Sequence, residues 1–101
     1  MPRESQIVKQ IKDFLDRTDH CFSHKFHGDA FSITGTPDIS GCIMGRRFEI
    51  EVKRPGKDPT PVQWRVMKKW RRSGAIVGVC RSLDEAKKLI YNARYIHKGT
   101  R

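Results

Sequence analysis

The sequence is short of negative charge, short of cysteine and without a long apolar segment. In 101 residues, 11 Asp and Glu stand against 21 Lys and Arg, which leaves a net charge of +10 at neutral pH. A basic excess of this size favours a polyanionic partner, and nucleic acid is the commonest one, because releasing its counterions drives association. The alternative is an ordinary soluble protein that happens to be basic.

The scarcity of cysteine excludes a disulfide framework. Cys21, Cys42 and Cys80 are odd in number and widely spaced, without a CxxC pair, which is typical of free thiols in a reducing compartment. Cys21, His24 and His27 suggest zinc, but neighbouring members of this set point to opposite faces of a strand, so we do not expect a zinc site. Because no run is long enough to span a bilayer and no signal peptide is visible, we expect a soluble, intracellular protein.

The length and composition predict one small folded domain. Apolar residues make up 37% and charged residues 32% of the chain, which is typical of a highly charged globule rather than a disordered tail. We expect a single domain across residues 1–101, with a core at about 4–95 and a frayed tail at 97–101. A homodimer would let so small a chain bury more surface.

The first half of the chain is predicted to contain a helix and three strands. Apolar residues at helical spacing indicate a helix over residues 4–17, and residues 21–27 are a weaker strand candidate. Residues 38–43 and 47–53 then favour a hairpin with its turn at 44–46. A loop with Gly28, Gly35 and Pro37 separates this hairpin from the first strand.

The second half is predicted to contain a helix, a buried strand and a final helix. Thr60 as N-cap, a proline at the first helical position and Gln63 as the capping-box partner indicate a helix over 61–73. An apolar strand at 75–80 follows, and a second capping box begins a helix over about 82–95. Three meandering strands and a crossover helix to a fourth predict an α/β fold, in which helices flank a mixed four-stranded sheet.

The strand at 47–53 alternates strictly between apolar and charged residues. Phe48, Ile50 and Val52 point one way, and Glu49, Glu51 and Lys53 point the other. A two-residue turn puts the apolar face of residues 38–43, with Ile39, Gly41 and Ile43, on the side of the first set. The same register puts Asp38 on the face of Glu51 and Lys53, whereas a one-residue slip would separate them.

Asp38, Glu51 and Lys53 are the residue types that phosphodiester hydrolysis needs. Carboxylates hold Mg²⁺ or Mn²⁺ well, because hard cations prefer oxygen ligands, and the carbonyl of Val52 offers a further oxygen. A bound cation polarises the phosphoryl group and acidifies water. A lysine beside it orients that water or stabilises the developing negative charge.

The run Gly35-Thr36-Pro37-Asp38, then Glu51-Val52-Lys53, then Gln63 resembles the VRR-NUC family, a branch of the PD-(D/E)XK nuclease superfamily. The resemblance implies a restriction-endonuclease-like core, a Mg²⁺ or Mn²⁺ cofactor and endonuclease activity. Stand-alone members of this size resemble phage and bacterial proteins that act as homodimers on branched DNA such as Holliday junctions. The family's metal carboxylates fall on Asp38 and Glu51, its lysine on Lys53, its helical acidic residue on Glu4 and its glutamine on Gln63.

Several of these residues also have ordinary structural explanations. Asp38 suits a turn after proline, and Glu4 complements the dipole of the first helix. Glu49 shares the face of Glu51 and is a rival ligand, although the ExK spacing favours Glu51. The amide of Gln63 cannot fully serve both a helix cap and an active site.

A basic surface is predicted along the helix at 61–73 and the loop before it. The candidate DNA contacts are Arg54, Lys57, Arg65, Lys68, Lys69 and Arg72. The last four share one helix face opposite an apolar stripe of Val62, Val66 and Trp70. Trp64 falls off that stripe and is a candidate dimer contact or base-stacking residue.

Three functions follow from these patterns. The first is a Mg²⁺- or Mn²⁺-dependent DNA endonuclease. The second is a basic nucleic-acid-binding module without catalysis, which has no need for facing carboxylates because these oppose phosphate binding. The third is a nuclease subunit that depends on a partner for its specificity.

Overall fold

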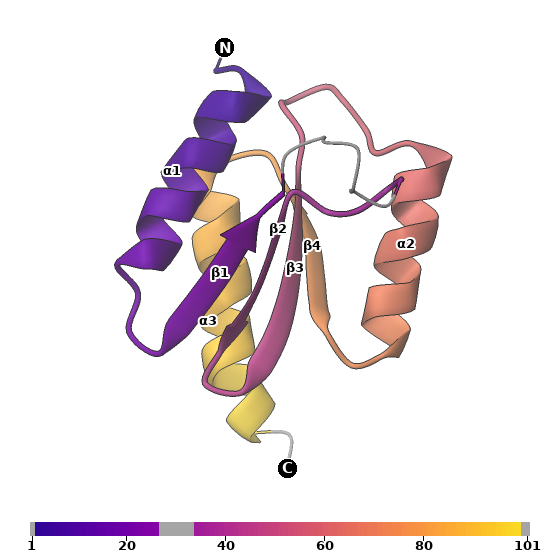
Figure 1. The fold of residues 1–101 in the computed structure, drawn as a ribbon. Helices are drawn as coiled ribbons and strands as arrows, with labels where there is room; N and C mark the ends of the chain where they lie inside the picture. The colour runs from indigo at the N-terminus through magenta and orange to yellow at the C-terminus, as the bar shows by residue number, and fades with distance from the viewer. Residues whose placement is uncertain (1, 27–33, 100–101) are drawn as a thin grey trace.

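Three helices and a four-stranded sheet make up the computed structural model, which describes residues 2–26 and 34–99, the last four by backbone alone (Figure 1). His27 and Gly28 lie outside the described residues. In chain order the elements are α1 (Glu4–Asp16), β1 (Cys21–Lys25), β2 (Ile39–Ile43), β3 (Arg46–Val52), α2 (Pro61–Arg72), β4 (Ile76–Cys80) and α3 (Leu83–Gly99). The expected order and the expected α/β class are confirmed.

The strands follow one another across the sheet in the order β1-β2-β3-β4. The first three pair antiparallel, and β4 pairs parallel to β3 after the crossover through α2. The sheet is therefore mixed, as predicted. None of the described helices is long and apolar enough to cross a membrane.

The hairpin between β2 and β3 turns on two residues, Met44 and Gly45. Both have positive φ, 51° and 81°, as the tight turn that matches the twist of paired strands requires. In the resulting register Ile39 lies opposite Ile50 and Ser40 opposite Glu49. The two-residue turn inferred from hydrophobic matching is confirmed, whereas the expected turn bounds of 44–46 were one residue too long, because Arg46 pairs with Ile43 and begins β3.

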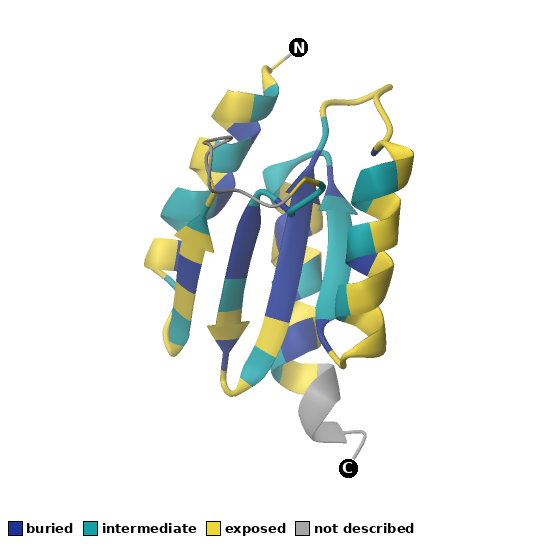
Figure 2. Cartoon of the chain, turned by 45° about the vertical axis from the view of Figure 1, so that its right-hand side comes forward, coloured by how far each residue is buried: buried dark blue, intermediate teal, exposed yellow. Residues whose placement is uncertain are grey.

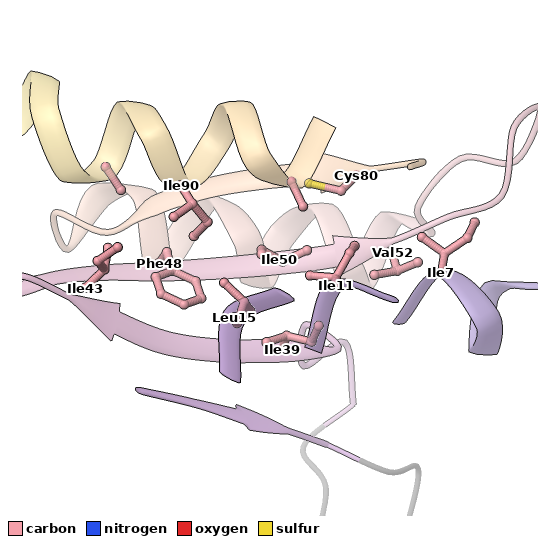
Figure 3. Close-up of a cluster of buried hydrophobic side chains, with 12 residues drawn as sticks. Ile7, Ile11, Leu15, Ile39, Ile43, Phe48, Ile50, Val52, Cys80 and Ile90 are labelled. Carbon is pink, nitrogen blue, oxygen red and sulfur yellow. The ribbon is translucent and has the colours of Figure 1, made fainter. Parts of the chain in front are cut away.

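The hydrophobic core lies between the sheet and the helices α1 and α3. Its buried members include Ile7, Ile11, Leu15, Ile39, Ile43, Phe48, Ile50, Val52 and Ile90 (Figure 3). Burying a side chain such as Ile50 contributes about 1.5–3 kcal/mol to stability. At Gly41 a Cβ would lie 2.5 Å from the Phe48 ring and 2.5 Å from the carbonyl oxygen of Phe22, so the core leaves no room there for a side chain.

The helix α2 lies apart from this core and packs against β4 (Figure 1). Met67 is its most buried residue, whereas Val62, Val66 and Trp70 are only half-buried. The predicted apolar stripe of α2 therefore faces the sheet, but the prediction left out Met67, which is its most buried residue. The strand β4 was expected to be buried; instead residues 76–79 are half-buried, because β4 is an edge strand that pairs on one side only, although both α2 and α3 contact it.

The last helix begins as predicted and ends later. The Ser82 hydroxyl accepts a hydrogen bond from the backbone N–H of Glu85 at 3.2 Å, while the Glu85 carboxylate accepts one from the N–H of Arg81 at 2.7 Å. The helix α3 continues to Gly99 rather than ending near Tyr95, and the expected frayed tail at 97–101 stays a prediction, since residues 100 and 101 lie outside the described residues. Gly99 is the first residue after Tyr95 that commonly ends a helix.

Candidate active site

Asp38 is placed by a short segment that packs between the sheet and α2. Gly35 has φ +87°, and a Cβ on it would lie 2.8 Å from Cγ1 of Val62, so only glycine fits there without strain. Pro37 is fully buried. The backbone N–H of Phe26 donates to the carbonyl of Asp38 at 2.9 Å, which continues the β1–β2 pairing and fixes the start of β2.

The Asp38 carboxylate is held against the end of β3. Its Oδ2 accepts a hydrogen bond from the backbone N–H of Val52 at 2.7 Å. Because Ile39 lies opposite Ile50 in the antiparallel register, Asp38 lies opposite Glu51, with both side chains on one face of the sheet. The structure thus brings together the two carboxylates that the sequence pattern predicted to face each other.

Glu51 is a buried carboxylate with an incomplete set of partners. It is 2% exposed. The Lys53 ammonium lies 3.4 Å from its Oε2, while its Oε1 is buried with no hydrogen-bond partner among the described residues. The backbone N–H of Lys53 donates to the carbonyl of Cys80 at 3.2 Å, which ties this end of β3 to β4. A buried acceptor without a partner is costly and calls for an explanation.

Electrostatics at this site disfavour two bare carboxylates. Burial, and then the neighbouring Asp38 charge, raise the pKa of Glu51 to about 7, although Lys53 opposes both effects. Burial also raises the pKa of Asp38, against the hydrogen bond from Val52 and the charge of Lys53. Glu4 adds negative potential and raises the pKa of both groups. The site is therefore short of positive charge, despite the basic character of the chain.

Glu49, the rival ligand, already has its partners. It is fully buried, its Oε1 accepts from the Ser40 hydroxyl, and its Oε2 accepts from Nε of Arg47 at 2.7 Å. The Arg47 guanidinium in turn lies 4.5 Å from the centroid of the Trp70 ring. Glu49 is thus occupied by a structural network, and Glu51 is the carboxylate with an unused oxygen.

Glu4 links the first helix to the segment that follows β3. Its Oε2 accepts from the backbone N–H of Arg54 at 3.3 Å. Together with its effect on the pKa values of Asp38 and Glu51, this contact places Glu4 at the border of the carboxylate pair. Its position combines the expected helix-dipole role with proximity to the site.

Gln63 forms the helix cap that the sequence predicted. Its backbone N–H donates to the Thr60 hydroxyl at 3.2 Å, and its side-chain oxygen accepts from the N–H of Thr60 at 2.9 Å. The side-chain oxygen is thereby engaged in the cap. The amide nitrogen is the atom through which Gln63 would act on a substrate.

The six predicted DNA contacts are all exposed. Arg54 and Lys57 lie in the loop between Lys53 and α2, where residues 54–57 line a hollow of about 260 Å³. On α2 the exposed residues are Arg65, Lys68, Lys69 and Arg72. Trp64 is 47% exposed and lines a shallow hollow of about 500 Å³ with Lys68, Arg71 and Arg72. The structure leaves this whole basic surface accessible to a polyanion.

Sequence reasoning missed Arg81, which anchors the loop before α2. Its guanidinium donates to the carbonyl of Lys57 at 3.0 Å and to the carboxylate of Asp58 at 2.9 Å. A lone arginine before a helix carries no local signal for such a contact, because its partners are distant in the chain.

A divalent cation fits the carboxylate pair. The free oxygen of Glu51 and the raised pKa values of Asp38 and Glu51 both indicate a site that lacks a positive charge. In the described part of the chain, no group of three or more His, Cys, Asp or Glu side chains could hold a metal ion. A cation here would therefore take two carboxylates, and backbone or water oxygens would complete its ligand set.

Comparison with protein-family models and with curated proteins gives no match. Among solved structures, a VRR_NUC domain superposes with a TM-score of 0.71 at 28% sequence identity, covering 87% of this chain and 94% of that one. A VRR_NUC domain protein superposes with a TM-score of 0.75 at 18% identity, covering 92% and 88% respectively. The fold resembles these domains over nearly its whole length, so this chain has the fold of a VRR-NUC domain.

Proposed function

We propose that this chain is a nuclease that hydrolyses phosphodiester bonds in DNA and depends on Mg²⁺ or Mn²⁺. The observation that carries the proposal is the buried Oε1 of Glu51, which has no hydrogen-bond partner among the described residues and lies beside a half-buried carboxylate, Asp38. A strongly basic protein has no structural reason to keep such a pair. A cation between the pair and a phosphate turns an unfavourable cluster into a binding site.

The residues of the site divide the chemistry between them. Asp38 and Glu51 would hold the cation, with the carbonyl of Val52 as a further oxygen. When bound, the cation withdraws charge from the phosphoryl group and lowers the pKa of a bound water. Lys53, whose side chain is 14% exposed beside Glu51, orients the attacking water and stabilises negative charge on the phosphate oxygens. Glu4 and the amide nitrogen of Gln63 would hold solvent and substrate at the border of the site.

DNA is the expected substrate because of the charge and the surface. The cations of the loop at 54–57 begin directly after Lys53 in the chain, and those of α2 follow that loop, so we expect a DNA backbone that binds the loop to run beside the carboxylates. We propose branched DNA cut by a homodimer as the particular substrate and assembly, on the strength of the family resemblance. Two copies related by a twofold axis would place two sites on one junction.

A binding module without catalysis is the second candidate. The accessible basic surface favours it. The carboxylate pair disfavours it, because two acidic groups repel phosphate unless a cation separates them. A nuclease that needs a partner for specificity shares the site and differs only in what the isolated chain can cut.

The test is cleavage of a labelled four-way DNA junction and of a matched linear duplex. Wild type, Asp38→Ala and Lys53→Ala are compared in Mg²⁺, Mn²⁺ and EDTA. Lys9→Ala is the control, because Lys9 is an exposed residue of α1 in a surface ion pair with Asp13. We expect metal-dependent cutting that the first two substitutions reduce by a factor of about 100 or more and the control leaves unchanged.

Binding without cutting under all these conditions would overturn the proposal for the isolated chain. Cutting that survives Asp38→Ala and Lys53→Ala would overturn the assigned site. The ratio of junction to duplex cleavage tests the substrate separately, and sedimentation of the free protein tests the homodimer.

A further inference from the structure

The sheet face that carries Asp38 and Glu51 is only partly covered. The helix α2 packs against β4, and within residues 2–26 and 34–99 no helix lies over β1 and β2 on that side (Figure 2). Successive residues of β1 point to opposite faces. Ser23 is buried toward α1, so Phe22 and His24 face the open side, and Phe26 continues the alternation. We call Phe22, His24 and Phe26 the aromatic strip.

The aromatic strip is exposed to solvent. Phe22 is 80% and Phe26 37% exposed, and His24 is exposed as well. The rings of His24 and Phe26 meet edge to face, with centroids 4.8 Å apart. Single exposed apolar residues need no explanation. Three exposed rings at alternate positions of one strand, on a sheet face that no described helix covers, instead offer neighbouring surfaces for stacking.

The strip leads directly to the carboxylate pair. The backbone N–H of Phe26 donates to the carbonyl of Asp38, so Phe26, Asp38 and Glu51 form one row across three strands. With adjacent strands about 4.8 Å apart, the backbone of Phe26 lies roughly 10 Å from that of Glu51. A second row joins Phe22, through Cys42, to Arg47, whose side chain is 49% exposed. The strip is therefore flanked by the candidate site at one end and by a cation at the other.

We propose that the aromatic strip stacks unpaired bases of the substrate strand beside the scissile phosphate. This inference rests on the proposed function and names a substrate class for it: DNA in which several nucleotides next to the cut are not paired. Bases inside a duplex are already stacked and cannot reach the rings, whereas exposed aromatic rings on a sheet stack about two or three unpaired bases in known single-strand-binding modules.

A second copy of the chain is the other occupant that an aromatic face could receive. A second copy brings a further net charge of +10 and no phosphate for Arg47, so the homodimer proposed above would form through another surface. A nucleic acid strand brings both bases for the rings and phosphates for Arg47 and the cations of α2. Charge complementarity therefore selects the nucleotide strand.

The first experiment compares binding of a labelled single-stranded oligonucleotide and of its blunt duplex by fluorescence anisotropy in EDTA. Phe22→Ala should weaken single-strand binding roughly fivefold or more and leave duplex binding unchanged. Phe22→Leu should weaken it as much, since leucine keeps an apolar surface but has no ring face, and Phe22→Tyr should restore it. Tyr91→Ala is the control, because Tyr91 is 61% exposed on α3, across the sheet.

The second experiment uses Cys42 as a probe. Cys42 is exposed, lies opposite Phe22 and shares its face, whereas Cys80 is buried. Single-stranded DNA should slow alkylation of Cys42, and equal concentrations of duplex should protect it less. The stacking proposal would be overturned if single-stranded and duplex DNA protected Cys42 equally. It would also be overturned if the Phe22 variants lost equal affinity for both DNAs, or if Phe22→Leu bound single strands as tightly as wild type. Dissociation of a dimer by Phe22→Ala would assign the strip to a second copy instead.

Failure of this inference is distinguishable from failure of the proposed function. If the chain cuts DNA in Mg²⁺ or Mn²⁺ but binds single strands equally well with and without the Phe22 ring, the proposed nuclease activity stands and the stacking role of the aromatic strip is wrong. If the chain never cuts DNA but its preference for single strands depends on the Phe22 ring, the stacking role of the aromatic strip stands and the proposed nuclease activity is wrong.

Discussion

Replacing Glu51 by glutamine should stabilise the metal-free protein at alkaline pH, although it removes a residue of the candidate site. The reason is the cost of a buried carboxylate with one unpartnered oxygen, next to the charge of Asp38. Glutamine has nearly the same shape and carries no charge, so the repulsion and most of the desolvation cost disappear.

The magnitude follows from the pKa of Glu51, which rises from its usual 4.5 to about 7 in the folded protein. Between these two pH values the unfolded chain has released a proton that the folded chain still holds. Unfolding therefore releases a proton, and the free energy of unfolding falls as pH rises. At about 1.36 kcal/mol per pKa unit, the loss reaches about 3 kcal/mol above pH 7. Below pH 4.5 it vanishes, and wild type and Glu51→Gln should be equally stable.

The assay is urea unfolding in EDTA at pH 4.5, 6 and 8. Glu51→Gln should match wild type at the lowest pH and exceed it by about 3 kcal/mol at pH 8. Glu49→Gln is the matched control, because Glu49 is equally buried on the same strand face but accepts hydrogen bonds from two donors, Ser40 and Arg47. That change should destabilise the protein by about 1–3 kcal/mol at pH 8, since it breaks satisfied contacts.

A wild type whose stability relative to Glu51→Gln does not change between pH 4.5 and 8 would refute the reasoning. So would a Glu51→Gln variant that is as destabilised as Glu49→Gln. Either result would mean that the Glu51 carboxylate is well accommodated in the metal-free fold and that its unpartnered oxygen says nothing about a cation.

The remaining predictions concern packing, ligand linkage and thiol chemistry. Gly41→Ala should lower the free energy of unfolding by about 1–3 kcal/mol in denaturant titration, because its Cβ would meet the Phe48 ring at 2.5 Å; wild-type stability would contradict this. Gly35→Ala should reduce both thermal stability and cleavage, since φ +87° and the contact with Val62 exclude a side chain; unchanged values of both would contradict the packing argument. Mg²⁺ at ten times its dissociation constant should raise wild-type stability at pH 8 by about 1.4 kcal/mol in the same urea assay and leave Glu51→Gln nearly unaffected; an equal rise in both would place the cation elsewhere. Cys80 should resist iodoacetamide at pH 8 in the native state, as followed by mass spectrometry, because burial raises its pKa to about 12; rapid alkylation there would show that the core opens.

Much of the fold was predictable because local signals agree with one another. The alternation at 47–53, the two-residue turn that hydrophobic matching requires, and the caps at Thr60 and Ser82 each specify one element. Together they determine the register that places Asp38 opposite Glu51. Register follows from the sequence here because a slip by one residue would put Phe48 and Ile50 into solvent.

What the sequence could not predict depends on contacts between distant residues. The local sequence pattern does not show which of Glu49 and Glu51 already has hydrogen-bond partners. Only the folded structure shows that Ser40 and Arg47 donate to Glu49. The exposure of Phe22 has a similar origin. Its alternation with Ser23 is visible in the sequence, but which helices cover which face of β1 is a property of the assembled layers.

The loop between β3 and α2 is tied down at both ends, by Glu4 at the backbone of Arg54 and by Arg81 at Lys57 and Asp58. Fixing the backbone of one residue costs about 1–2 kcal/mol of conformational entropy. In this chain that ordering occurs during folding rather than when a ligand arrives. A phosphate that meets the loop therefore encounters cations already in place, and more of the electrostatic attraction remains as affinity.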